Sequence, residues 1–177
     1  MTIFTATKLK LVSLIMLIIG AIPYSLQSAT TLQITGNIKA GACRVNFPTS
    51  GVDVNLGEGI RQYTLENAGS ASPWVNFRLQ LTGCPQTTKN VTMTVGGTPD
   101  PAAPDTFINT GSATNMQIQV QNMSDGRVLG NGANVTQPVE KGSATTEFNL
   151  QARAYSVSGN TTPGTIVGTM QIGFTYQ

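Results

Sequence analysis

The sequence predicts an all-β fold, an antiparallel sandwich or barrel. Along several segments apolar residues alternate with polar ones, as expected for strands that bury one face. Turn-forming Gly, Pro, Asn and Ser residues separate these segments. Of the 177 residues only 10% are charged and none is His. The lack of His excludes Ser-His-Asp and Cys-His catalytic arrangements and His-ligated zinc, which disfavours an enzyme.

The first 29 residues (1–29) are predicted to be a cleaved signal peptide. Two lysines precede the apolar run 11–22, Pro23 ends the run, and small residues lead to a cleavage point after Ser28 or Ala29. As a helix, the apolar run would span about 18 Å, short of the ~30 Å bilayer core, so no permanent membrane anchor is expected. Cleavage after Ala29 leaves eight basic and eight acidic residues, a balance that gives no attraction to nucleic acid or to a membrane surface.

Six segments of the mature chain alternate with period two. The first, 30–39, directly follows the leader, and the others lie at 75–81, 91–95, 116–120, 148–154 and 165–176. The polar, uncharged stretches 96–104 and 130–138 are predicted to be loops between strands that share one core. This organisation predicts one domain after the leader.

Cys43 and Cys84 are the only cysteines. In an exported protein an even pair most simply forms a disulfide bond. Closing a loop of this length would stabilise the fold by about 3–4 kcal/mol in the chain-entropy model. A catalytic thiol would need a neighbouring base, and the chain has no His to provide it.

The alternating segments at the two ends of the mature chain do not fit a self-contained sandwich. Segment 165–176 carries neither charge nor proline, whereas exposed sheet edges are usually short, charged or bulged. It therefore predicts an edge strand that needs a partner. Segment 30–39 has one apolar face and also lacks a partner. A spare strand and a bare edge on one chain suggest strand exchange between copies.

Together these features resemble the fimbrial (pilus) subunits assembled by the chaperone–usher pathway, and the resemblance covers the whole chain. It rests on the leader, the early Cys43, Cys84 within LQLTGCP, Gly164 at the fourteenth position from the end, and the penultimate Tyr176. The stretch NAGSASPWVNFRLQLTGCP is most similar to the minor adaptor subunits of type 1 fimbrial tips. The resemblance implies a non-enzymatic structural subunit that supports cell adhesion and carries neither cofactor nor metal.

The resemblance also implies a fold and a set of partners. The fold is an incomplete immunoglobulin-like sandwich of six strands, whose missing seventh strand is a donor strand from a neighbouring subunit. Here 41–177 would be the pilin domain and 30–40 the donor extension. The implied partners are a periplasmic pilus chaperone, an outer-membrane usher and neighbouring fimbrial subunits, on a route through the periplasm to a fimbria on the bacterial surface.

Two sets of residues would form the joint between subunits. The donor residues that face the neighbour's core would be Thr30, Leu32, Ile34, Gly36 and Ile38. The acceptor groove, and the strand that the chaperone reads, would be formed by Gly164, Ile166, Gly168, Met170, Ile172, Phe174 and Tyr176.

Other functions stay open on the sequence alone. A major shaft pilin would share all these features with a tip adaptor. A secreted β-sandwich that binds a receptor or a glycan would share the leader and the strands. A secreted hydrolase that relies on carboxylates alone is disfavoured, because none of the acidic residues lies in a setting that pairs it with another.

Overall fold

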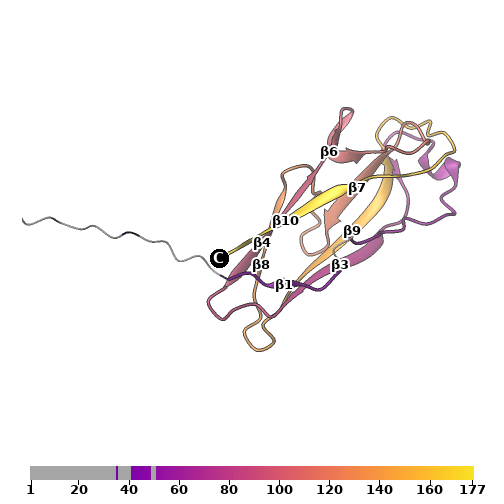
Figure 1. Ribbon diagram of the computed structural model, residues 1–177. Helices are drawn as coiled ribbons and strands as arrows, with labels where there is room; N and C mark the ends of the chain where they lie inside the picture. The colour runs from indigo at the N-terminus through magenta and orange to yellow at the C-terminus, as the bar shows by residue number, and fades with distance from the viewer. Residues whose placement is uncertain (1–34, 36–40, 49–50) are drawn as a thin grey trace, which may run out of the picture. The chain divides into compact units, whose positions relative to one another are not determined.

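The computed structural model of the protein describes residues 35, 41–48 and 51–177 (Figure 1). All elements below belong to the second of the two units into which the chain divides, 38–177. The predicted signal peptide and all five predicted donor residues lie outside the described residues. Within the described ranges no helix is long and apolar enough to cross a membrane.

Two antiparallel sheets build the fold. The larger has the order β1-β3-β9-β7-β6-β5, and β2 also pairs with β9. Its strands are β1 (Arg44–Val45), β2 (Ser70–Ala71), β3 (Val75–Thr82), β5 (Pro99–Asp100), β6 (Ala103–Ile108), β7 (Gln117–Asn122) and β9 (Thr146–Ser156). The smaller has the order β10-β4-β8 and consists of β4 (Asn90–Gly97), β8 (Asn134–Pro138) and β10 (Met170–Tyr176). A 3-10 helix, η1 (Gln62–Leu65), precedes β2.

The core lies between the sheets and follows the period-two pattern of the sequence. In β9 every second residue from Phe148 to Ala154 is buried, and the intervening residues are half-buried or exposed. β9 and β10 belong to different sheets, and the ring centroids of Phe148 on β9 and Phe174 on β10 lie 5.8 Å apart across the core. The prediction of an all-β sandwich is confirmed, and β3, β4, β7, β9 and β10 each overlap a predicted segment.

Two stretches that were predicted to be loops contain strands. β5 and the start of β6 lie within 96–104, and β8 lies within 130–138. In β8 only Val135 is buried, so the strand carries almost no apolar alternation. It is held instead by its pairing with β4 and by side-chain hydrogen bonds, including Thr94 Oγ1 to Asn134 Oδ1 at 2.6 Å. Pairing with a neighbour, rather than burial of its own face, makes this segment a strand.

The last strand is shorter than the prediction of 165–176. It begins at Met170, which pairs with Gly97, the last residue of β4. Beyond Gly97 the smaller sheet offers no further strand to pair with, since β4 has ended. The backbone of Thr165 and Val167 bonds instead to the loop that follows β6.

Candidate functional site

A groove with a volume of about 1410 Å³ lies beside β10. It runs between residues 45–48 and 51–65 on one side and 161–172 on the other. Its lining includes residues of the hydrophobic core from both sheets, namely Phe77, Leu79, Val95, Ile118, Val120, Leu150 and Ala152. A groove that reaches core side chains is what a sandwich leaves when one strand of a sheet is missing.

Most of the predicted acceptor residues line this groove. The structure places Gly164, Ile166, Gly168, Met170 and Ile172 in its wall. Phe174 and Tyr176 lie farther along β10 and pack against the core there. All seven therefore lie on one continuous stretch of chain, and none of the five side chains larger than glycine is fully exposed.

The outer edge of β10 is bare. Gln177 exchanges two backbone hydrogen bonds with Asn90, at 2.9 and 3.0 Å. Because bonded and non-bonded pairs alternate along an antiparallel ladder, the odd-numbered residues of β10 also bond to β4. The N–H and C=O groups of Met170, Ile172, Phe174 and Tyr176 therefore point to the opposite edge. Within the described part of the chain that edge pairs with no other strand.

The apolar face of β10 is only half-buried. Ile172 and Phe174 are half-buried, whereas Phe148 and Leu150 on β9 are almost inaccessible. For Ile172 the difference arises because this side chain lines the groove, which leaves one flank uncovered. Partial burial raises the pKa of the Tyr176 phenol above its ordinary value. An apolar face and an unpaired backbone edge thus lie side by side, which is the surface that an added strand would cover.

The second wall was missed by the sequence prediction. It is formed by the segment after β1, where Phe47, Val54 and Leu56 are half-buried and pack against the core. This segment contains Gly51, Gly57 and several polar residues, and its described parts, 46–48 and 51–61, form no strand. Only the spacing of Val54 and Leu56, two residues apart, could have indicated an inward face.

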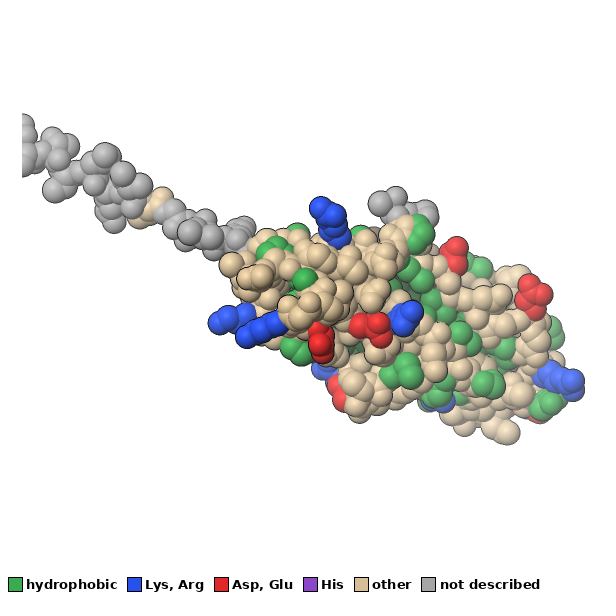
Figure 2. All heavy atoms as spheres, turned by 90° about the horizontal axis from the view of Figure 1, so that it is seen from below, with side chains coloured by type: hydrophobic (Ala, Val, Ile, Leu, Met, Phe, Trp, Pro, Cys, Tyr) green, Lys and Arg blue, Asp and Glu red, His purple; other side chains and the backbone are tan. Residues whose placement is uncertain are grey.

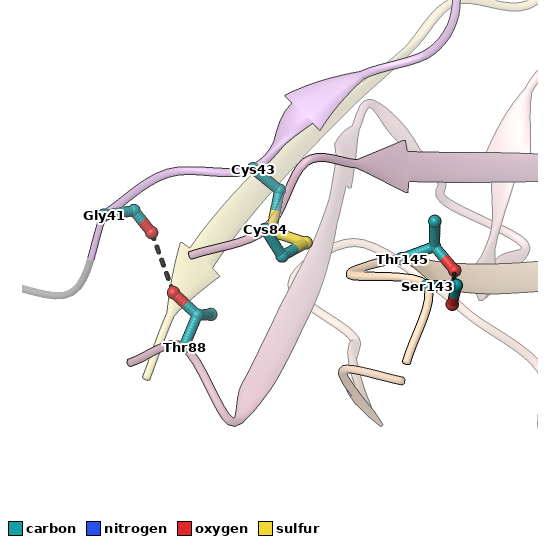
Figure 3. The surroundings of a disulfide bond; sticks show 6 residues. All are labelled: Gly41, Cys43, Cys84, Thr88, Ser143 and Thr145. Atoms are coloured by element: carbon teal, nitrogen blue, oxygen red, sulfur yellow. Dashed lines mark hydrogen bonds between the residues drawn. A yellow bond between two sulfur atoms is a disulfide. The ribbon is translucent and has the colours of Figure 1, made fainter. Parts of the chain in front are cut away.

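The predicted disulfide bond between Cys43 and Cys84 is present and ties the chain just before β1 to the end of β3 (Figure 3). The backbone N–H of Cys84 donates a hydrogen bond to Ala144 O at 2.9 Å. Beside it, Thr88 Oγ1 donates to Gly41 O at 3.0 Å. The chain therefore enters the described fold at a point that is fixed covalently and by hydrogen bonding.

Removing the disulfide is expected to lower stability by about 3–4 kcal/mol, because the unfolded chain regains the entropy of a closed loop of 41 residues. Urea unfolding of the Cys43→Ala/Cys84→Ala protein, with a donor strand bound, would measure the loss. Reduction of the native protein is the matched comparison and should give a similar shift. Intact-mass measurement of the exported protein should find it lighter than the dithiol by two hydrogen atoms, and free thiols there would contradict the bond.

The surface offers little charge for recognition. On the face shown in Figure 2, charged side chains of both signs are few and most of the surface is neutral. The described residues form two ion pairs, Arg78–Glu147 and Arg127–Asp125, both partly exposed. Arg153 stacks over the Trp74 ring at 4.1 Å, and burial lowers the pKa of its guanidinium. The groove, and not a charged patch, is therefore the principal candidate for binding.

Two antiparallel sheets, in which the bare edge of β10 lies beside an apolar groove, define the class of protein: an incomplete immunoglobulin-like sandwich of the pilin type. Residues 32–177 match the family model described as "Fimbrial protein". The chain belongs to this family of fimbrial subunits.

Individual relatives and structures agree with the family. The chain is 39% identical to the S-fimbrial adhesin protein SfaS of Escherichia coli O6:K15:H31, over 96% of this chain and 99% of that protein. It is 36% identical to protein FimG of Escherichia coli K12, over 82% and 84% of the two chains. The fold is similar to a subunit in a solved chaperone–usher pilus, with a TM-score of 0.64, 18% identity, and coverage of 88% of this chain and 100% of that one.

These findings confirm the predicted class. The protein is a chaperone–usher fimbrial subunit, a structural protein and not an enzyme. It is exported through the periplasm and resides in a fimbria on the cell surface, where it polymerises with neighbouring subunits.

Proposed function

We propose that the groove beside β10 accepts the N-terminal extension of a neighbouring subunit, and that the extension 30–40 of this chain fills the groove of another. The observation that carries the proposal is the bare edge of β10 next to exposed core side chains. An incoming extended segment would pair its backbone with this edge and place alternate side chains in the groove. Because donor and acceptor are different surfaces of one chain, the contact does not close and propagates into a fibre.

The extension has the composition that such a groove requires. Leu32, Ile34 and Ile38 would bury large aliphatic side chains, which contributes on the order of 5–9 kcal/mol. Ordering the extension opposes part of this gain, and the new ladder hydrogen bonds add direction and register. Thr30 and Gly36 complete five positions spaced two apart, which together span about 26 Å of extended chain.

Before assembly the same groove must be covered, because exposed core would otherwise aggregate. A periplasmic chaperone would cover it with one of its own strands and read the segment from Gly164 to Tyr176. An outer-membrane usher would then be the place where the chaperone strand is exchanged for the extension of the next subunit. The bare edge that supports subunit pairing supports chaperone binding as well.

Within the fimbria we propose a minor subunit at the tip, acting as an adaptor that supports adhesion. The resemblance of the stretch 67–85 to type 1 tip adaptors supports this role, as does the similarity to a protein named an S-fimbrial adhesin. A major shaft subunit is the alternative. The stoichiometry of the chain in purified fibres separates the two, since a shaft subunit would dominate the fibre and an adaptor would be rare.

A donor peptide should rescue the isolated protein. Without chaperone or peptide, the mature chain is expected to aggregate or to unfold without cooperativity. With excess synthetic peptide of residues 30–39, it should give a single cooperative melting transition, followed by circular dichroism. A peptide carrying Ile34→Asp and Ile38→Asp is the matched control and should not rescue. A cooperative melt of the monomeric chain without any peptide would contradict the missing-strand proposal.

A further inference from the structure

We propose that Asn109 and Ser112 lengthen the strand-accepting edge beyond the end of β4. In this view their side chains bind the backbone of Val167 and Thr165 as a neighbouring strand would. They thereby hold the backbone groups of Ile166 free for the incoming strand. The inference rests on the function proposed above and adds positioning residues to it.

The first contact is made at Val167. Its backbone N–H donates a hydrogen bond to Asn109 Oδ1 at 2.8 Å, and its carbonyl accepts one from the backbone N–H of Thr110 at 2.8 Å. The hydroxyl of Thr110 donates to the same carbonyl at 3.1 Å. Both backbone groups of Val167 are thus engaged on one side, although no strand lies there.

The second contact repeats the arrangement two residues earlier. The backbone N–H of Thr165 donates to Ser112 Oγ at 2.9 Å, and the Thr165 carbonyl accepts from the backbone N–H of Ala113 at 3.1 Å. Asn109 Nδ2 also donates to Thr165 O at 3.3 Å. A spacing of two residues is the repeat of a β-ladder, so the loop 109–113 acts as a short substitute strand.

Glycines make this close approach possible. A side chain at Gly111 would place its Cβ 2.1 Å from Thr165 O, and one at Gly164 would place its Cβ 2.4 Å from Ala113 N. Each would therefore collide with backbone that cannot easily move. The glycine that marks the family's last strand, fourteenth from the end, thus lies against the loop that substitutes for β4.

In an extended chain the backbone N–H and C=O groups of successive residues point to opposite edges, which determines the groups that stay free for an incoming strand. Since Thr165 and Val167 use their backbone groups toward the loop, those of Ile166 and Gly168 point the other way, to the same edge as Met170. Neither Ile166 nor Gly168 makes a backbone hydrogen bond to another residue that the structure describes. The accepting edge therefore runs from Ile166 to Tyr176.

The accepting edge must be at least as long as the donor segment that pairs with it. The inward positions of β10 alone, Met170 to Tyr176, span about 20 Å, less than the ~26 Å of the five donor positions. Starting the edge at Ile166 gives about 33 Å, enough for the whole donor. Without the contacts of Asn109 and Ser112, the first part of the edge would not be held extended, and one end of the donor would remain unpaired.

The test compares Asn109→Ala with Thr114→Ala in the mature chain bound to the peptide of residues 30–39. Thr114 is a matched control because its hydroxyl bonds Thr162 Oγ1 between the same two segments but touches neither Thr165 nor Val167. Amide hydrogen exchange is followed by NMR, with peptide dissociation as a second readout. Asn109→Asp keeps an oxygen that can accept from Val167 N–H.

In the wild type and in Thr114→Ala, the bound peptide should protect the amides of Ile166, Gly168, Ile172 and Phe174. In Asn109→Ala, Ile166 and Gly168 should exchange at least about tenfold faster while the β10 amides stay protected, and the peptide should dissociate about tenfold faster. Asn109→Asp should restore the protection. Ser112→Ala, a milder change, should expose Ile166 more than Gly168.

Full protection of Ile166 and Gly168 in Asn109→Ala, with the peptide bound as in the wild type, would overturn this inference and leave the proposed function standing. Loss of protection along all of β10 in that variant would also overturn it, since that would be general destabilisation. A wild-type chain that binds no peptide would instead overturn the proposed function itself.

Discussion

Replacing Phe174 by Asp is expected to remove most of the chaperone-bound subunit from the periplasm. The Phe174 ring packs on Phe148 in the core, 5.8 Å between centroids. An unpaired carboxylate in that position costs several kcal/mol, a large share of the roughly 5–15 kcal/mol that stabilises a whole domain. The subunit should fail to fold on the chaperone and be degraded. The amount of subunit that co-purifies with a tagged chaperone measures the effect.

Thr175→Asp provides the control on the neighbouring residue. Thr175 is exposed on the outer face of the same strand, so the same carboxylate remains in water. This variant should accumulate on the chaperone at close to the wild-type level. Equal capture of the two variants would show that the inward face of β10 has been assigned to the wrong residues.

Replacing Ile38 by Asp is expected to block attachment of this subunit to its neighbour in the fibre, while the amount bound to chaperone stays unchanged. Under the proposed function, Ile38 enters the groove of a different subunit and contributes nothing to the core of its own. The carboxylate would be buried unpaired only when the joint forms. Ile34→Asp should behave in the same way. Incorporation into fibres, measured beside chaperone capture, separates the two steps.

Asn37→Asp is the matched control, since it adds the same charge at a position between two groove-facing residues. It should enter fibres nearly as well as the wild type. Normal incorporation of Ile38→Asp would rule out the donor role of residues 30–40. A sandwich that completes itself with its own strand would lose stability equally from Ile38→Asp and Phe174→Asp, so the contrast between them is the decisive result.

Much of the fold could be predicted because its sheets bury one face. β3, β4, β7 and β9 each place apolar residues at every second position against the core, and the disulfide follows from an even pair of cysteines in an exported chain. β8 could not be predicted in this way. Its strand state depends on pairing with β4, a contact between segments about 40 residues apart that leaves almost no trace in local hydrophobicity.

The residues of the candidate site were likewise predicted only where apolar residues alternate along the chain. The alternating pattern identified Ile166, Met170 and Ile172, which line the groove although no regular strand exists before Met170. It also identified Phe174 and Tyr176, which pack against the core farther along β10. The opposite wall escaped prediction because its polar, glycine-containing sequence has no sustained period. Asn109 and Ser112 escaped it too, since a polar loop residue that binds backbone far along the chain resembles any other polar loop residue.

The position of the disulfide determines how the subunit would carry mechanical load. A pull on the chain at Gly41 reaches Cys43 two residues later, before it reaches β1. Without the disulfide bond, the two residues of β1 could be peeled from β3 one hydrogen bond at a time. The bond passes the force directly to Cys84 just beyond the end of β3. The chain between the two cysteines, including the groove wall that contains Val54 and Leu56, is therefore bypassed. Tension along a fibre would load the joint between subunits while leaving this wall of each groove unstretched.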